Sequence, residues 1–209
     1  LLYEAGLPGP MLSVLLGSVE DLIEPMVADE RVDLVTFTGS THVGKQLPKV
    51  AGYKKLCLEL GGNAPLIVLD DAKMDLAVTL AAEGCFRNSG QRCTAVKRLL
   101  VHEKILPEFT ERFVAKVVEY PAGDPADEAT RVGTVIDEPA AVELENRVKA
   151  AVAQGAKVLA GGNRQGALLE PTVIADVPRD AKMVVEESFG PLAPILAVRD
   201  LSDAIDLAN

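Results

Sequence analysis

The chain has 209 residues, of which 48% are hydrophobic and 25% are charged, a balance that is ordinary for a globular protein. Its formal net charge of −10 argues against binding to DNA or RNA, because non-specific binding to a polyanion needs a basic surface. No apolar run reaches the roughly 20 residues that cross a membrane, and we expect no membrane association.

Strands and helices alternate along the chain. In chain order we predict a strand over 11–16, a helix over 19–28, a strand over 33–37, a helix over 42–50, strands over 55–60 and 65–69, a helix over 74–86, a strand over 97–101, helices over 105–119 and 140–154, strands over 157–159, 170–174 and 192–198, and a helix from 202. This alternation predicts an α/β architecture with largely parallel sheets. The segment from Leu60 to Asn63 is the best candidate for a domain boundary.

The cysteines indicate a reducing compartment. There are three, Cys57, Cys85 and Cys93, and an odd number does not fit a disulfide framework. We therefore expect a cytoplasmic location. We also expect no metal site, because no Cys/His pair has zinc-ligand spacing. The chain starts without Met or a signal-peptide pattern and stops inside a predicted helix, so we expect both ends to be cut.

A glycine-containing turn follows the strand over 33–37 and opens a helix, with the sequence F-T-G-S-T-H-V-G. Helix N-termini favour phosphate, and glycine lets the backbone approach it closely. Gly39, Ser40 and Gly44 therefore form a candidate phosphate-binding turn. The alternative is a plain helix cap by Ser40 or Thr41.

An acidic residue lies in an apolar run beside a glycine pair, in the segment L-E-L-G-G-N. Desolvation of the Glu59 carboxylate at this strand end would suit a general base. The alternative is an edge glutamate in a salt bridge.

A cysteine follows a polar turn in the segment N-S-G-Q-R-C-T-A. The neighbouring Arg92 favours the thiolate of Cys93, which makes this residue a candidate nucleophile. We predict that Cys57, in an apolar strand, and Cys85, on the apolar face of a helix, are inert core residues.

Two carboxylates precede a turn in the segment E-E-S-F-G-P, residues 186–191. They are suited to holding sugar hydroxyls, and the ring of Phe189 is suited to packing on a flat cofactor. The alternative is a solvated acidic loop.

Together, in order and in spacing, these four segments resemble the aldehyde dehydrogenase superfamily. The resemblance covers essentially the whole chain, and it implies a Rossmann-like dinucleotide-binding domain followed by an α/β catalytic domain. Residues 1–62 would form the C-terminal part of the first domain, and residues 63–209 a truncated catalytic domain. It also implies a homodimer or homotetramer.

The resemblance assigns roles residue by residue. Cys93 matches the nucleophile, which forms a thiohemiacetal and then a thioester, and its backbone N–H matches half of an oxyanion hole. Glu59 matches the base that activates water. The positions that match cofactor contacts, for NAD or NADP with NAD favoured, are Gly39, Ser40, Gly44, Leu60, Glu187 and Phe189.

The string G-Q-R-C-T-A-V-K-R narrows the substrate. It is similar to the subgroup acting on anionic aldehydes, including phosphonoacetaldehyde dehydrogenase and non-phosphorylating glyceraldehyde-3-phosphate dehydrogenase. Arg92 is the candidate anion anchor, because a guanidinium binds phosphonate in a fork geometry, and Thr94 is a further substrate contact. The alternative for Arg92 is pairing with a local carboxylate.

Three other functions stay open: a succinate-semialdehyde-type dehydrogenase, a CoA-acylating relative, and a non-catalytic protein on the same fold. Glu59 argues against the CoA-acylating relative, and Cys93 with Glu59 argues against the non-catalytic protein. The asparagine that completes the oxyanion hole and the residues that select NAD or NADP lie outside the chain. We expect the isolated chain to be inactive or poorly folded, because uncovered sheet edges invite aggregation.

Overall fold

The computed structural model describes residues 1–209, except for the side chains of residues 19 and 20. It consists of two compact units, unit 1 (residues 1–60) and unit 2 (residues 61–209). The division falls between Leu60 and Gly61, inside the L-E-L-G-G-N segment.

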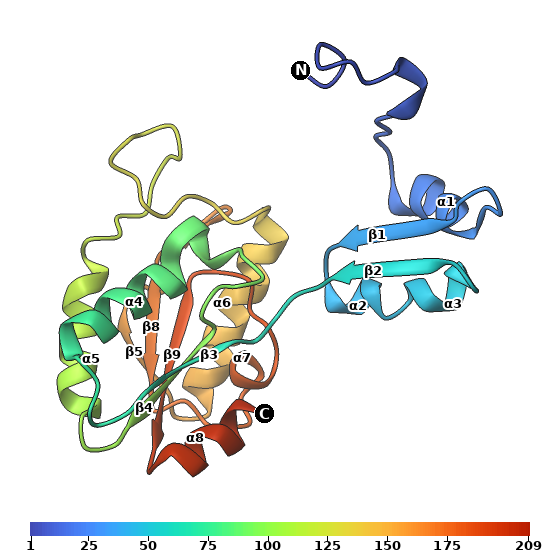
Figure 1. The fold of residues 1–209 in the computed structure, drawn as a ribbon. Coiled ribbons are helices and arrows are strands. Elements are labelled where there is room, and N and C mark those ends of the chain that lie inside the picture. The colour runs from blue at the N-terminus through green and yellow to red at the C-terminus, as the bar shows by residue number, and fades with distance from the viewer. The chain divides into compact units, whose positions relative to one another are not determined.

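Unit 1 is built on a parallel pair of strands, β1 and β2 (Figure 1). Its elements are η1 (Gly9–Met11), η2 (Val19–Ile23), α1 (Glu24–Ala28), β1 (Leu34–Thr38), α2 (Thr41–Gly44), α3 (Leu47–Ala51) and β2 (Lys55–Glu59). Every second side chain of both strands is half-buried, and these side chains pack against α1 and α3. The alternation follows from the strand period of two.

Three predictions for unit 1 are wrong. Residues 12–16 form no strand, because their apolar side chains are exposed and no described strand pairs with this segment. The helix predicted over 42–50 is two helices, since Pro48 has no N–H and its ring would clash with the carbonyl of Gly44, where α2 ends. Cys57 is exposed rather than in the core, because it lies on the face of β2 opposite Leu56 and Leu58.

Unit 2 is a five-stranded sheet with helices on both faces (Figure 1). The strand order is β3-β4-β9-β8-β5, in which the first four strands are parallel and β5 is antiparallel. The main elements are β3 (Pro65–Val68), α4 (Met74–Phe86), η3 (Arg87–Gly90), β4 (Arg98–His102), α5 (Leu106–Val117), α6 (Glu138–Ala153), β5 (Lys157–Ala160), β8 (Thr172–Ala175), β9 (Leu192–Val198) and α8 (Leu201–Ala208). The predicted α/β alternation is confirmed in this unit.

The core of unit 2 has two halves, one on each face of the sheet. Leu99 and Val101 of β4 pack with α4 and α5, whereas Leu100 between them packs with α6. Strands covered on both faces read as continuous apolar runs, as 99–101 does. Three short elements were not predicted because they are too brief for periodicity, namely β6 (Arg164–Gln165), β7 (Leu168–Leu169) and α7 (Lys182–Val185).

Two further observations concern the described residues only. None of their helices is both long and apolar enough to cross a bilayer. No group of three or more of their His, Cys, Asp or Glu side chains is placed to hold a metal ion.

Candidate active site

Unit 1 brings the glycine turn and Glu59 to one edge of its sheet. In the parallel register Thr38 pairs with Glu59, so β1 and β2 end side by side. The backbone N–H of Gly39 donates to the carbonyl oxygen of Glu59 at 3.0 Å. The Glu59 side chain is exposed at this edge, so the desolvation expected for its carboxylate is absent within unit 1.

Ser40 acts as a helix cap in this turn. Its hydroxyl oxygen accepts a hydrogen bond from the backbone N–H of Val43 at 3.2 Å, at the start of α2. Gly44 is buried, and a Cβ there would lie 2.3 Å from a methyl carbon of Leu60. Leu60 therefore packs on α2 and supports the turn. The cap alternative for Ser40 is confirmed, and its contact with a phosphate stays a prediction.

The turn over residues 87–93 carries the predicted nucleophile Cys93 and is called the nucleophile turn below; its backbone is strained. After α4 ends at Phe86, Asn88 and Ser89 adopt φ values of 55° and 54°, in the left-handed region that non-glycine residues rarely occupy. Such residues cost on the order of 1–3 kcal/mol each and cluster at functional sites. Surrounding contacts must hold this turn in place.

Those contacts come from the segment 133–136. The Ser89 hydroxyl donates to the carbonyl of Gly133 at 3.0 Å. The Gln91 amide donates to the carbonyl of Thr134 at 3.2 Å and accepts from the N–H of Ile136 at 2.8 Å. The turn then presents Cys93, whose side chain is exposed. Within the described part of the chain, the Cys93 N–H donates to no other backbone group, which leaves it free for an oxyanion.

Three of the four sequence segments converge within unit 2. A Cβ on Gly61 would lie 1.8 Å from a carboxylate oxygen of Glu187, so only glycine admits this carboxylate. The N–H of Gly62 donates to Glu187 Oε1 at 3.1 Å, and a Cβ on Gly62 would lie 3.1 Å from the Cys93 carbonyl oxygen. The glycine pair therefore lies between Glu187 and Cys93.

The chemistry of this convergence fits the nicotinamide end of a dinucleotide. Among the described hydrogen bonds of Glu187, one carboxylate oxygen accepts from Gly62, which leaves the other available to a ribose hydroxyl. Phe189 is 45% exposed, with a φ of 47° that a tight turn requires. A free carboxylate oxygen and an open aromatic ring are what such a group needs.

Arg92 is engaged by the protein itself. Its guanidinium donates to the backbone carbonyls of Glu83, Gly84 and Arg87 at 3.2, 3.1 and 3.3 Å, at the C-terminal end of α4. A cation there is favoured by the helix dipole. These contacts do not include the alternative carboxylate pair, and the role of Arg92 as an anion anchor stays a prediction. Thr94 is exposed next to Cys93.

Lys97 was not predicted as a site residue. It is 2% exposed, and its ammonium donates to the carbonyl of Gly90 at 2.7 Å and lies 3.9 Å from Glu187 Oε1. The available signal was a pair of charges, Lys97 and Arg98, inside the otherwise apolar run 95–101, a signal similar to the one that pointed to Glu59.

Cys85 has the inert environment predicted for it. It is buried, and burial raises the pKa of its thiol from 9.0 to about 12. Because the pKa is raised, the folded Cys85 thiol stays protonated and neutral at pH 8. We expect iodoacetamide at pH 8 to modify Cys93 at least about 100-fold faster than Cys85, measured by peptide mass spectrometry. In urea the two rates should become similar; equal rates in the folded protein would contradict the assignment.

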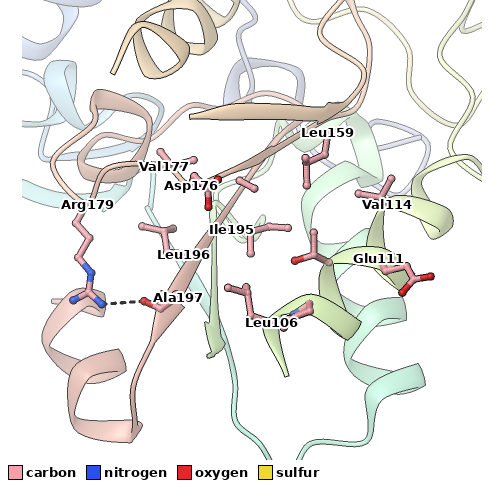
Figure 2. A pocket seen from close by; sticks show the side chains of 13 residues that line it. Leu106, Glu111, Val114, Leu159, Asp176, Val177, Arg179, Ile195, Leu196 and Ala197 are labelled. Atoms are coloured by element: carbon pink, nitrogen blue, oxygen red, sulfur yellow. Dashed lines mark hydrogen bonds between the residues drawn. The ribbon is translucent and has the colours of Figure 1, made fainter. Parts of the chain in front are cut away.

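A cavity of about 840 Å³ lies elsewhere in unit 2, between α5 and the strands β5, β8 and β9 (Figure 2). Its wall is mainly apolar, with Leu106, Val114 and Ile195 among the lining residues. The guanidinium of Arg179 at its rim is held by the carbonyl of Ala197 at 2.9 Å and by Asp203. None of the predicted site residues lines this cavity, so we do not assign the chemistry to it.

Comparison with known proteins decides the family. A sequence model described as the aldehyde dehydrogenase family matches residues 1–209. The chain belongs to the aldehyde dehydrogenase family. Glutarate-semialdehyde dehydrogenase of Pseudomonas putida is 39% identical over 212 residues, which is all of this chain and 44% of that protein. Mitochondrial succinate-semialdehyde dehydrogenase of Arabidopsis thaliana is 43% identical over 216 residues, again all of this chain and 40% of that protein.

A solved structure gives the same result for the fold. The chain is similar to glyceraldehyde-3-phosphate dehydrogenase from Methanocaldococcus jannaschii, complexed with NADP, with a TM-score of 0.94 and 39% identity. The match covers 100% of this chain and 45% of that one. The α/β aldehyde dehydrogenase fold is thereby confirmed. The chain spans less than half the length of these relatives.

Proposed function

We propose that the protein oxidises an aldehyde to a carboxylic acid with NAD or NADP, through a thioester on Cys93. The observation that supports this most directly is the convergence of Cys93, the glycine pair and Glu187 within unit 2. The same residues occupy the places that the family resemblance gives to the nucleophile and the ribose-binding carboxylate. Assays with NAD and with NADP would show which of the two cofactors the protein uses.

Cys93 opens the reaction. Its thiolate attacks the aldehyde carbon and forms a thiohemiacetal, whose oxyanion would accept a hydrogen bond from the Cys93 N–H. The nicotinamide cofactor, when bound, would supply the two-electron oxidant, as an acceptor of hydride from the thiohemiacetal carbon. Cys93 then holds the acyl group as a thioester. The Glu187 carboxylate and the Phe189 ring would hold the ribose and the nicotinamide.

Glu59 completes the reaction as the general base. Its carboxylate takes a proton from water, and the resulting hydroxide attacks the thioester carbonyl and displaces the Cys93 thiolate. The products are a carboxylic acid and the regenerated thiolate. This step needs an accessible carboxylate, which agrees with the exposure of Glu59 at the end of β2.

Glu59→Gln should separate the two halves of the reaction. In the full-length protein we expect one equivalent of reduced cofactor per site in a rapid burst, followed by a steady-state rate lowered about 100- to 1,000-fold. The thioester still forms but is hydrolysed slowly. Stopped-flow absorbance at the wavelength of reduced nicotinamide measures both phases.

Glu103→Gln is the matched control for this variant. Glu103 is an exposed glutamate that directly follows β4, so it also stands at a strand end. Its replacement should leave burst and steady state unchanged. Normal steady-state turnover by Glu59→Gln would remove Glu59 as the base, and acyl-CoA formation in the presence of CoA would favour the CoA-acylating relative.

For the substrate, we propose an aldehyde with an anionic group at the far end of a short chain. The support comes from relatives, whose names specify glutarate semialdehyde, succinate semialdehyde and glyceraldehyde 3-phosphate. Each of these compounds carries an anion at neutral pH. The contacts of Arg92 with α4 do not favour phosphonate over carboxylate, so semialdehydes come before phosphonoacetaldehyde in this proposal.

A panel of aldehydes tests activity and substrate class together. The full-length protein is assayed with succinate semialdehyde, glutarate semialdehyde and phosphonoacetaldehyde, and with butanal and pentanal as neutral controls of similar length. A charge-assisted hydrogen bond predicts kcat/KM at least about tenfold higher for the best anionic aldehyde. Equal kcat/KM values for the neutral aldehydes would contradict the proposed anionic substrate class. If no aldehyde gave reduced cofactor, the proposed function itself would be wrong.

A further inference from the structure

Lys97 places a buried cation between two of the segments that form the candidate site. Its side chain is 1% exposed, and its backbone is held just before β4, where its N–H donates to the carbonyl of Ala64 at 2.9 Å. Burial lowers the pKa of Lys97, and the neighbouring Glu187 acts in the opposite direction. A buried ammonium is costly unless its partners compensate for lost hydration, so its contacts explain its presence.

The first contact reaches the nucleophile turn. The Lys97 ammonium donates to the carbonyl of Gly90 at 2.7 Å, three residues before Cys93. Gly90 packs closely on the backbone carbonyls of Gly190 and Cys85, since a Cβ there would lie 2.2 and 2.9 Å from their oxygens. The ammonium therefore adds a hydrogen bond to a closely packed turn.

The second set of contacts reaches the segment E-E-S-F-G-P. The ammonium lies 3.9 Å from Glu187 Oε1 and 5.0 Å from the ring centroid of Phe189. Both contacts attract a cation, one as an ion pair and the other as a cation–π contact. The same carboxylate oxygen of Glu187 accepts a hydrogen bond from the N–H of Gly62.

We propose that Lys97 is a positioning residue, whose ammonium ties the Gly90 carbonyl to the Glu187 carboxylate and so holds the nucleophile turn and the cofactor-binding carboxylate at one spacing. The role of Glu187 and Cys93 in this statement rests on the proposed function, whereas the tie between the two segments does not.

The test compares Lys97→Met with Lys104→Met in the full-length protein. Both changes remove one lysine charge, but Lys104 is exposed and pairs with Asp70 at 3.0 Å on the surface. The first readout is the rate at which iodoacetamide modifies Cys93 without cofactor, followed by peptide mass spectrometry. The second is the separate measurement of kcat and of KM for the cofactor.

For Lys97→Met we expect about tenfold slower alkylation of Cys93, because loss of the ammonium releases the turn that presents this thiol. We also expect kcat about 100-fold lower, because a shift of about 1 Å in a reacting group has that effect, and a raised cofactor KM as Glu187 is released. Lys97→Arg keeps the donor and the charge and should recover most of both rates. Lys104→Met should match the unmodified protein.

Unchanged alkylation and kcat in Lys97→Met, with only a lower melting temperature, would overturn the proposal and leave Lys97 a structural residue. Should that variant fail to fold, Lys97→Gln provides the comparison, because it keeps a hydrogen-bond donor and removes the charge. An alkylation rate for Lys97→Gln equal to that of the unmodified protein would equally overturn it. If no aldehyde is oxidised by the unmodified protein, the proposed function fails while the alkylation rates still decide the role of Lys97.

Discussion

Cys93→Ser in the full-length protein should lower aldehyde-dependent formation of reduced cofactor by at least about 10⁴-fold. A serine hydroxyl is a far weaker nucleophile than a thiolate at neutral pH, and no base is hydrogen-bonded to this position among the described contacts. The strained turn at Asn88 and Ser89 remains intact, so the variant should fold normally. Steady-state absorbance measures turnover, and cofactor titration by fluorescence should give an unchanged Kd.

Cys57→Ser is the matched control for this change. Cys57 is also an exposed thiol in the described structure, but it lies on β2 of unit 1 and takes no part in the nucleophile turn. Its replacement should leave turnover within about twofold, as for surface changes away from a site. Turnover by Cys93→Ser close to that of the control would show that the covalent mechanism is wrong.

Sequence periodicity predicts an element well when the apolar side chains of that element all face one core. Helix α4 begins and ends where its apolar spacing indicates, at Met74 and Phe86, because Val78, Ala81, Ala82 and Cys85 all face one core. The apolar segment 12–16 has comparable composition but no strand beside it in the described structure. A strand needs a neighbour to satisfy its backbone groups, and a single segment does not reveal that neighbour.

The candidate site also has features that the sequence indicates and features that only the folded structure shows. The sequence pointed to Glu59 beside the glycine pair, whereas the close approach of Glu187 to Gly61 and Gly62 is seen only in the folded unit. The sequence could not predict which acceptors the Arg92 guanidinium contacts. The backbone carbonyls at the C-terminal end of α4 compete with any anion for this group. Which acceptor wins depends on where a long side chain can reach, and that is a property of the folded turn.

Gly90→Ala should damage stability and catalysis together. The residue has a φ of 69°, and an added Cβ would lie 2.2 Å from the carbonyl oxygen of Gly190 and 2.9 Å from that of Cys85. Backbone atoms cannot rotate away as a flexible side chain can. Left-handed strain of about 1–2 kcal/mol adds to overpacking of about 1–3 kcal/mol, so we expect the free energy of unfolding to fall by about 2–5 kcal/mol.

Displacement of this turn also moves the Gly90 carbonyl that Lys97 holds and, three residues on, Cys93. We therefore expect kcat to fall about 100-fold in Gly90→Ala, measured beside urea unfolding.

Gly166→Ala is the control that separates backbone strain from side-chain packing. Its φ is 57° and nothing lies within 4 Å of the added Cβ, so it should lose only about 1–2 kcal/mol and no activity. Equal losses of stability in the two variants, with unchanged kcat, would mean that the packing of Gly90 on Gly190 does not position the nucleophile.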